Sequence, residues 1–154
     1  MDLMLYSGKG VQRNYEEAIK YYKMAIDKGE LNSMNNLGLM YYTGKGVQQN
    51  YEEAIKYYKM AIEGGDPEAM NTYASMNRDG IGIPINYEEA IKYYKMAINK
   101  GFSKAMNNYA LMLKRGLGIT VNFPEASKYY KMAIDKGNES AMFNYATMLE
   151  RGNG

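Results

Sequence analysis

A thirteen-residue phrase, Asn-Tyr-Glu-Glu-Ala-Ile-Lys-Tyr-Tyr-Lys-Met-Ala-Ile, occurs three times without a change, starting at Asn14, Asn50 and Asn86. A fourth copy starts at Asn122 and differs at three positions, so the four starts are 36 residues apart. A fixed period of this length is typical of stacked-repeat proteins, in which each unit packs only against its neighbours. Residues kept in every copy mostly serve the stacking, so we expect function where the copies differ.

The period also sets the expected domain organisation. The chain is four periods of 36 residues plus ten, so residues 1–10 and 145–154 occupy the same phase of the repeat. We therefore interpret 1–154 as a single repeat array, made of a partial repeat 1–10 and the units 11–46, 47–82, 83–118 and 119–154. Because the array is framed by incomplete copies, a fragment of a longer multidomain protein is a second interpretation.

The repeated phrase predicts a helix over 50–65, which we call helix B. Asn50 is a good N-cap, and Glu53 stands where its carboxylate can return a hydrogen bond to the backbone of the cap. Glu52 and Lys56 are spaced for a favourable i, i+4 ion pair, and glycine ends the segment. Apolar residues recur at i, i+4, i+7 and i+8, which favours one buried stripe. They are Ala54, Tyr58, Ala61 and Ile62.

A second helix, helix A, is predicted from Asp66 to about Gly80. Asp66 is the cap, and Pro67 takes the first-turn position that tolerates proline. The equivalent ranges are 31–43, 103–115 and 139–151, with a stub at 2–7. Small residues share one phase of helix A, where they allow close helix packing opposite bulky tyrosines. They are Gly38, Ala74, Ala110 and Ala146. The expected fold class is all-α, a right-handed α-solenoid of antiparallel helical hairpins.

The pattern of residues in one repeat resembles that of a known family. They appear as Leu37-Gly38, Tyr41, Gly44-Lys45-Gly46-Val47, Ala54, Tyr57-Tyr58, Met60-Ala61-Ile62 and Gly65. This pattern is similar to that of the Sel-one-like repeat (SLR) family, a relative of the tetratricopeptide repeat, and it covers the whole chain. The resemblance implies a scaffold that assembles other proteins.

Composition excludes several classes of function. The chain has 19 basic and 17 acidic residues with the signs interspersed, which is unlike the basic patch of a nucleic-acid-binding protein. It has no cysteine for a disulfide framework or a zinc ribbon. Neither a signal peptide nor an apolar run long enough to span a membrane is visible. We expect a soluble intracellular protein, placed in the cytoplasm, with no membrane or nucleic-acid partner and with no metal or other cofactor.

Two motifs superficially suggest chemistry. Gly-x-Gly loops start at Gly8, Gly44, Gly80 and Gly116, but each follows a predicted helix, whereas a phosphate-binding loop follows a strand. They are interpreted as connections between helix A and helix B. Paired glutamates open each exact copy of helix B, yet histidine and cysteine are both absent. We interpret the glutamates as capping and ion-pair residues and expect no enzyme activity.

Two further residue types recur at fixed phases. Tyr22, Tyr58, Tyr94 and Tyr130 lie on the apolar stripe and are interpreted as core residues rather than a ligand-stacking platform. Met24, Met60, Met96 and Met132 either seal the seam between repeats, which we favour, or form an exposed ladder for a partner.

Function is expected on helix A, which lines the concave face in tetratricopeptide-like stacks. The candidate partner-binding residues at the concave phases are Asn35, Leu39 and Tyr42; Asn71, Ser75 and Arg78; Asn107, Leu111 and Lys114; and Phe143, Thr147 and Glu150. A recurrent asparagine can hydrogen-bond a peptide backbone, while the variable neighbours select side chains. The alternative is that these residues are merely solvated polar positions.

The leading hypothesis is a scaffold or adaptor that binds a protein or peptide segment on this concave face. The alternative is a structural array that assembles with itself. The last helix A, 138–151, has no helix B after it, so its meeting with the start of another copy would be a head-to-tail contact that propagates.

Overall fold

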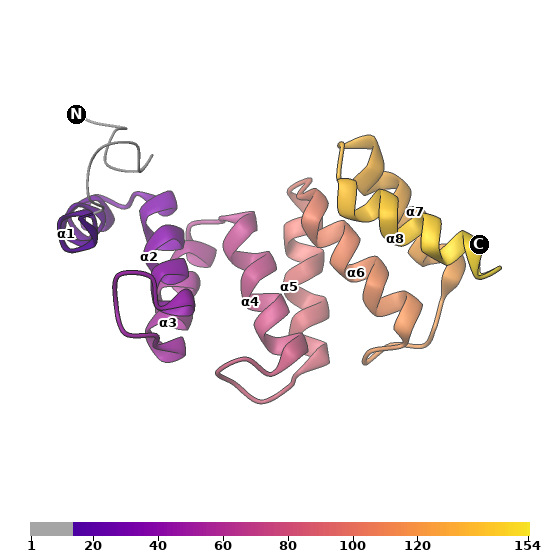
Figure 1. Ribbon diagram of the computed structural model, residues 1–154, viewed down its shortest axis with the longest axis horizontal. Coiled ribbons are helices and arrows are strands. Elements are labelled where there is room, and N and C mark those ends of the chain that lie inside the picture. Colours follow the sequence, from indigo (N-terminus) through magenta and orange to yellow (C-terminus); the bar gives the residue numbers. More distant parts are fainter. Residues whose placement is uncertain (1–13) are drawn as a thin grey trace. The chain divides into compact units, whose positions relative to one another are not determined.

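The computed structural model describes residues 14–154, and within them it contains eight α-helices and no strand (Figure 1). The helices are α1 (Tyr15–Ile26), α2 (Leu31–Thr43), α3 (Tyr51–Glu63), α4 (Pro67–Asp79), α5 (Tyr87–Asn99), α6 (Ser103–Arg115), α7 (Phe123–Asp135) and α8 (Glu139–Glu150). Odd-numbered helices are helix B and even-numbered helices are helix A. The expected all-α class and the expected helix ranges are confirmed, whereas the stub at 2–7 and the loop at Gly8 lie outside the described residues.

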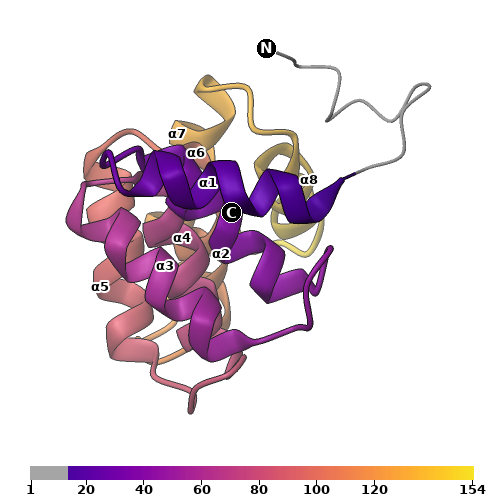
Figure 2. The same ribbon diagram turned by 90° about the vertical axis from the view of Figure 1, so that its left-hand side faces the viewer.

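The described part of the chain forms two compact units, residues 14–64 and 65–154, which we call the N-terminal and the C-terminal unit. In the N-terminal unit α2 and α3 pack along one another as a hairpin (Figure 1 and Figure 2). In the C-terminal unit α4 packs on α5 and α6 packs on α7 in the same way. Each hairpin buries the apolar stripes of both of its helices, which is the arrangement that the repeated phrase predicts.

The part of the buried core that helix B contributes consists of positions that the repeat keeps. Ala54, Tyr58 and Ala61 of α3 are buried, as are Tyr94 of α5 and Tyr130 of α7. The interpretation of these tyrosines as core residues is confirmed, although Tyr22 of α1 is only half-buried. Small residues let the rings approach closely, because a Cβ atom added at Gly38 would lie 2.9 Å from Cε1 of Tyr58.

The methionines of helix B differ along the chain. Met60 is half-buried and packs against the cluster of Leu37, Met40 and Tyr57 in the N-terminal unit, as expected for a residue that seals a seam. Met96 and Met132 are also half-buried, whereas Met24 is 50% exposed. The exposed-ladder alternative therefore does not describe the three later copies.

Helix B begins at the predicted cap, but the cap works differently from the prediction. The side chain of Asn50 accepts a hydrogen bond from the backbone N–H of Glu53 at 3.1 Å, as expected. Its own backbone N–H donates to the carbonyl oxygen of Tyr41 in α2 at 2.9 Å, not to the carboxylate of Glu53. The reciprocal capping box was a wrong prediction, because helix A already satisfies this N–H group. The same bond recurs from Asn86 to Asn77 and from Asn122 to Leu113, at 2.8 and 3.0 Å.

The expected ion pair on helix B is also corrected. Lys56 lies 3.7 Å from the carboxylate of Glu53, at i, i+3, rather than pairing with Glu52. In α5, Lys92 pairs with Glu89 in the same way at 3.1 Å. Because the carboxylate at this position is not used in a capping box, it is available to the lysine one turn later. These pairs are exposed and stabilise the helix only slightly.

The Gly-x-Gly segments connect helix A to helix B, as predicted. Gly44, Gly80 and Gly116 end α2, α4 and α6 with φ of 71°, 70° and 69°, a left-handed conformation that glycine adopts at little cost. The second glycine allows a close approach of the chain, because a Cβ atom at Gly118 would overlap the side chain of Tyr87. Because these glycines are explained by helix ends and close packing in the hairpins, they do not indicate a phosphate-binding site.

Candidate interaction surface

The predicted concave residues lie on α2, α4, α6 and α8, all of them helix A. In the N-terminal unit, Asn35 and Tyr42 are half-buried and Leu39 is 48% exposed. The ring of Tyr42 packs against Tyr51, with centroids 5.6 Å apart. The more informative arrangement is in the C-terminal unit, where α4, α6 and α8 carry the other nine predicted residues.

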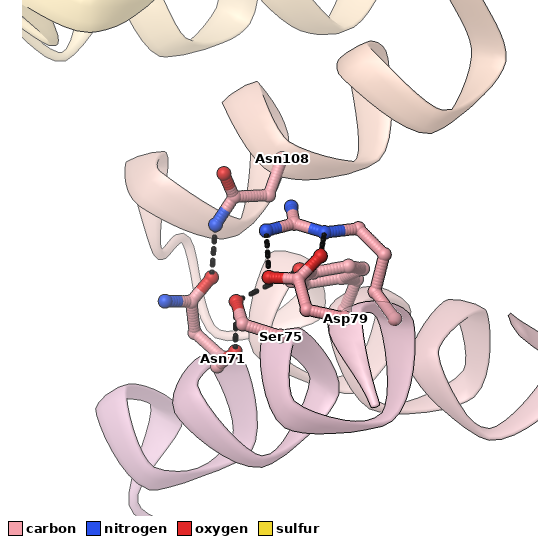
Figure 3. A network of polar contacts seen from close by, with 6 residues as sticks. Asn71, Ser75, Asp79 and Asn108 are labelled. Carbon is pink, nitrogen blue, oxygen red and sulfur yellow. Dashed lines mark hydrogen bonds and ion pairs between the residues drawn. The ribbon is translucent and has the colours of Figure 1, made fainter. Parts of the chain in front are cut away.

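Asparagines connect these three helices side to side. The side-chain amide of Asn108 donates to the side-chain oxygen of Asn71 at 3.0 Å, which links α6 to α4 (Figure 3). In the next repeat, Asn144 of α8 donates to Asn107 of α6 at 2.9 Å. We call this set of four residues the asparagine ladder. Each bond joins residues 37 positions apart, so the ladder holds helix A of one repeat against helix A of the next.

The ladder changes the interpretation of the recurrent asparagine. Asn71 and Asn107 are only 9% and 8% exposed, so they are not simply solvated polar positions. Their partners, Asn108 and Asn144, were not among the predicted residues. The signal that could have identified one of them is the Asn-Asn pair at 107–108, in which the second asparagine stands one period after Thr72.

Each rung of the ladder leaves hydrogen-bonding atoms unused. A primary amide has two N–H donors and an oxygen acceptor, and a rung uses one donor and one oxygen. In the part of the chain that the structure describes, no protein partner is found for the Nδ2 atoms of Asn71 and Asn107. The same holds for the side-chain oxygens of Asn108 and Asn144. Donors and acceptors therefore both remain available along α4, α6 and α8.

Two open depressions adjoin at the ladder, with volumes of about 460 and 520 Å³. Residues of the first are Asn71, Ser103, Lys104, Asn107, Asn108, Gly137, Asn138, Glu139 and Ser140. Residues of the second are Arg78, Asn107, Asn108, Leu111, Glu139, Ser140, Phe143 and Asn144. Of the predicted site residues, Asn71, Arg78, Asn107, Leu111 and Phe143 lie at these depressions. Ser75, Lys114, Thr147 and Glu150 line neither.

Ser75 instead takes part in a polar network inside the α4–α5 hairpin (Figure 3). Its hydroxyl donates to the backbone oxygen of Asn71 at 3.0 Å and lies 2.9 Å from the hydroxyl of Tyr94. The geometry therefore lets Tyr94 donate to Ser75. Burial raises the pKa of Tyr94, while the bond to Ser75 acts in the opposite direction. Ser75 thus has a structural partner within its own hairpin.

Arg78 is paired with its neighbour in the chain. Its Nε and Nη2 atoms each donate to the carboxylate of Asp79 at 2.7 Å, and this hydrogen-bonded pair raises the pKa of Arg78. The bidentate pair holds the guanidinium at the second depression. Its charge is largely balanced there by Asp79.

Positive charge gathers at the end of α6. Burial lowers the pKa of Lys114, and the nearby charges of Arg115 and Arg151 lower it further. Glu150 is exposed. Thr147 is half-buried, and its hydroxyl donates to the backbone oxygen of Phe143 at 2.8 Å.

Residues 14–154 contain no group of three or more acidic, histidine or cysteine side chains that could hold a metal ion. Over the same residues, no helix is long and apolar enough to cross a membrane.

Comparisons with known proteins agree with this architecture. The Sel1 repeat model matches residues 3–30, 31–66, 67–102, 103–138 and 139–154. No curated protein matches the chain. A Sel1 repeat protein from Oxalobacter formigenes is 34% identical with a TM-score of 0.87, over 97% of this chain and 62% of that one. A protective antigen with an SLR fold from uropathogenic Escherichia coli is 26% identical with a TM-score of 0.86, over 96% of this chain and 32% of that one.

The chain thus spans less than two thirds of the length of either of these structures. Helicobacter pylori cysteine rich protein B shares the fold, with 20% identity and a TM-score of 0.65, over 88% of this chain and 98% of that one. These solved structures confirm the expected α-solenoid class of SLR hairpins. The five repeat matches, together with the structural likeness, establish that the chain belongs to the Sel1 repeat family.

Proposed function

We propose that this chain is an interaction scaffold that binds an extended protein or peptide segment along α4, α6 and α8 of the C-terminal unit. Sel1 repeat proteins generally mediate protein–protein interaction and are mostly non-catalytic scaffolds. The proposal adds a face and a mode of binding to that general role. The single observation that carries it is the asparagine ladder with its unused donors and acceptors.

The ladder suits main-chain recognition. An extended segment presents N–H and C=O groups in alternation, with a rise of about 3.3 Å per residue. The Nδ2 atoms of Asn71 and Asn107 can donate to its carbonyl oxygens, and the oxygens of Asn108 and Asn144 can accept from its N–H groups. Because these groups are neutral amides held in place by one another, they engage a backbone without selecting its side chains. Little ordering entropy is then lost on binding.

Selectivity would come from the residues beside the ladder. Phe143 is 72% exposed at the second depression, where Leu111 is half-buried. An apolar side chain of the bound segment can cover both of them, and burial of a large apolar side chain is the usual main contribution at such a surface. Lys104 and Glu139 stand at the first depression and offer charges of both signs.

The test should remove the donors without breaking the ladder. In the double variant Asn71→Asp, Asn107→Asp, a carboxylate oxygen still accepts from Asn108 and from Asn144, but the Nδ2 donors are gone. Peptides are first selected from a displayed random library against the wild-type chain, and their affinity for the variant is then measured by calorimetry. We expect a loss of at least about tenfold, which corresponds to about 1.4 kcal/mol.

The matched control is Asn99→Asp on the exposed surface of α5. It makes the same chemical change, and positions 27, 63 and 135, one or more periods away, are already acidic. Circular dichroism and urea unfolding establish that both variants keep the helical fold. The proposal is refuted if the selected peptides bind the double variant as tightly as the wild-type chain, or if both variants weaken binding equally.

A further inference from the structure

The start of α6 differs from the start of each other described helix, because no side chain caps it. In α4 the carboxylate of Asp66 accepts from the backbone N–H groups of Glu68 and Ala69 at 2.8 and 2.9 Å. The equivalent residue of α6 is Phe102, whose side chain offers no acceptor. Lys104 also stands in α6 where α4 has the acidic Glu68. Both acidic groups that complement the positive end of the helix dipole in α4 are therefore missing in α6.

Backbone donors at this helix start are left unused. The N–H group of Ala105 donates to the carbonyl oxygen of Phe102 at 3.1 Å, whereas the N–H groups of Ser103 and Lys104 have no partner among the described residues. The first N–H groups of a helix have no acceptor within the helix, so they take one from outside it. A side-chain carboxylate is the acceptor that α2 and α4 use.

Buried amide donors line the same depression, and this second observation is independent of the helix start. Asn71 and Asn107 are 9% and 8% exposed, and both line the first depression together with Ser103 and Lys104. Their side-chain oxygens are used in the ladder, but their Nδ2 atoms have no partner in the described part of the chain. Figure 3 shows the Nδ2 atom of Asn71 turned away from Asn108. A hollow of about 460 Å³ therefore has unused backbone and amide donors in its wall.

The charges at the first depression suit a single carboxylate. Lys104 is exposed there, and Glu139 is the one acidic residue that lines it. Glu139 stands in the first turn of α8, where the dipole of that helix stabilises its charge. Lys136 adds a positive charge nearby, since a Cβ atom at Gly101 would lie 3.3 Å from its Nζ atom. The repulsion of Glu139 disfavours a doubly charged phosphate more than a carboxylate, which carries one charge.

We propose that the first depression binds a carboxylate side chain, Asp or Glu, of the extended segment, so that the partner is acidic at this point. This deepens the proposed function and rests on it for the segment. The carboxylate accepts from the N–H groups of Ser103 and Lys104 and pairs with the ammonium group of Lys104. Such charge-assisted bonds are stronger than the neutral bonds of the ladder, so this contact selects partners whereas the ladder does not.

The decisive variant is Phe102→Asp, which gives α6 the carboxylate that α4 already has. It should raise the urea midpoint of unfolding, because it caps the helix, and it should occupy the donors that the ligand needs. The matched control is Phe102→Ala, which removes the same ring and supplies no carboxylate. Lys104→Gln, at an exposed position, tests the charge without touching the cap.

The probes are a peptide selected from a displayed random library on the wild-type chain and its analogue in which the acidic residue is replaced by the corresponding amide. We expect the selection to enrich Asp or Glu, and calorimetry to show the acidic peptide binding at least tenfold more tightly than the analogue. The ratio of the two affinities should fall to about one in Phe102→Asp, fall several-fold in Lys104→Gln and stay unchanged in Phe102→Ala. Glu139→Gln should tighten binding of the acidic peptide only.

The inference is overturned if the wild-type chain binds acid and amide equally, or if Phe102→Asp keeps the full ratio. The ladder is tested separately with the amide analogue on the Asn71→Asp, Asn107→Asp chain. Weaker binding there, with an acid-to-amide ratio of one on the wild-type chain, would keep the proposed function and reject this inference.

A probe that is not a peptide separates the opposite case. Glutarate, added at constant ionic strength, should shift the backbone N–H signals of Ser103 and Lys104 in NMR spectra of the wild-type chain and not of Phe102→Asp. These shifts without binding of any peptide would support the carboxylate site and reject the segment of the proposed function. Absence of the shifts from the wild-type chain would overturn the carboxylate site.

Discussion

Two tyrosines at the same position of successive repeats should respond differently to loss of their hydroxyl group. Tyr94 and Tyr130 are both fully buried. The hydroxyl of Tyr94 lies 2.9 Å from that of Ser75, whereas the hydroxyl of Tyr130 is buried without a hydrogen-bond partner. The reason is the residue opposite, because Leu111 occupies in α6 the position of Ser75 in α4. The substitutions Tyr94→Phe and Tyr130→Phe remove the same atom from these two environments.

The expected magnitudes follow from this difference. A hydrogen bond between neutral groups contributes about 1 kcal/mol net, so Tyr94→Phe should lower the free energy of unfolding by about that amount. Tyr130→Phe loses no hydrogen bond and relieves the desolvation of a hydroxyl group, so the free energy of unfolding should stay the same or rise. For a chain of this length, 1 kcal/mol corresponds to a change in Tm of about 2–4 °C.

Urea unfolding followed by circular dichroism measures both variants, with calorimetry as a second probe. The double-mutant cycle of Ser75→Ala with Tyr94→Phe should give a coupling energy of about 1 kcal/mol. The argument fails if Tyr130→Phe destabilises the chain as much as Tyr94→Phe does. A coupling energy near zero between Ser75 and Tyr94 would contradict it as well.

Two further predictions concern a loop and alkaline pH. Gly118→Ala should destabilise the chain by about 1–3 kcal/mol more than Gly137→Ala in urea unfolding. Both glycines have positive φ, 64° and 78°, but a Cβ atom meets Tyr87 at the first and open space at the second; equal losses would contradict the packing argument. Burial raises the pKa of Tyr130 to about 12, above the value of about 10 for an unfolded chain. The contribution of this shift to the free energy of unfolding is therefore complete below pH 10 and is lost as the pH rises towards 12. Tyr130→Phe should therefore lose less stability than the wild-type chain across that interval, and parallel pH profiles would show that Tyr130 does not titrate in this way.

Much of the fold could be predicted from the sequence because its signals are local and repeated. The bounds of α2 and α6 agree with the predicted ranges, and Asn50 caps helix B as expected. Cap residues, glycine stops and the spacing of apolar residues act within one or two helical turns. Repetition at a period of 36 then separates these signals from chance.

The predictions that were wrong concern atoms with two possible partners. Glu53 was assigned to the backbone of Asn50, but the carbonyl oxygen of Tyr41 takes that N–H group and Glu53 pairs with Lys56. The spacing of residues in a helix shows which groups can meet, but it cannot show that a neighbouring helix supplies a better acceptor.

The candidate site shows the same difference between local and tertiary information. The sequence alone determined that Asn71 and Asn107 recur on helix A and that their neighbours vary. Only the tertiary structure decided that these two asparagines bind Asn108 and Asn144, since each bond joins residues of different repeats. It also decided which tyrosine hydroxyl has a partner, because Ser75 lies opposite Tyr94 whereas the hydroxyl of Tyr130 has none. The physical reason is that the local pattern determines where a helix forms, whereas the fate of a polar atom or an apolar side chain depends on what the next helix places against it.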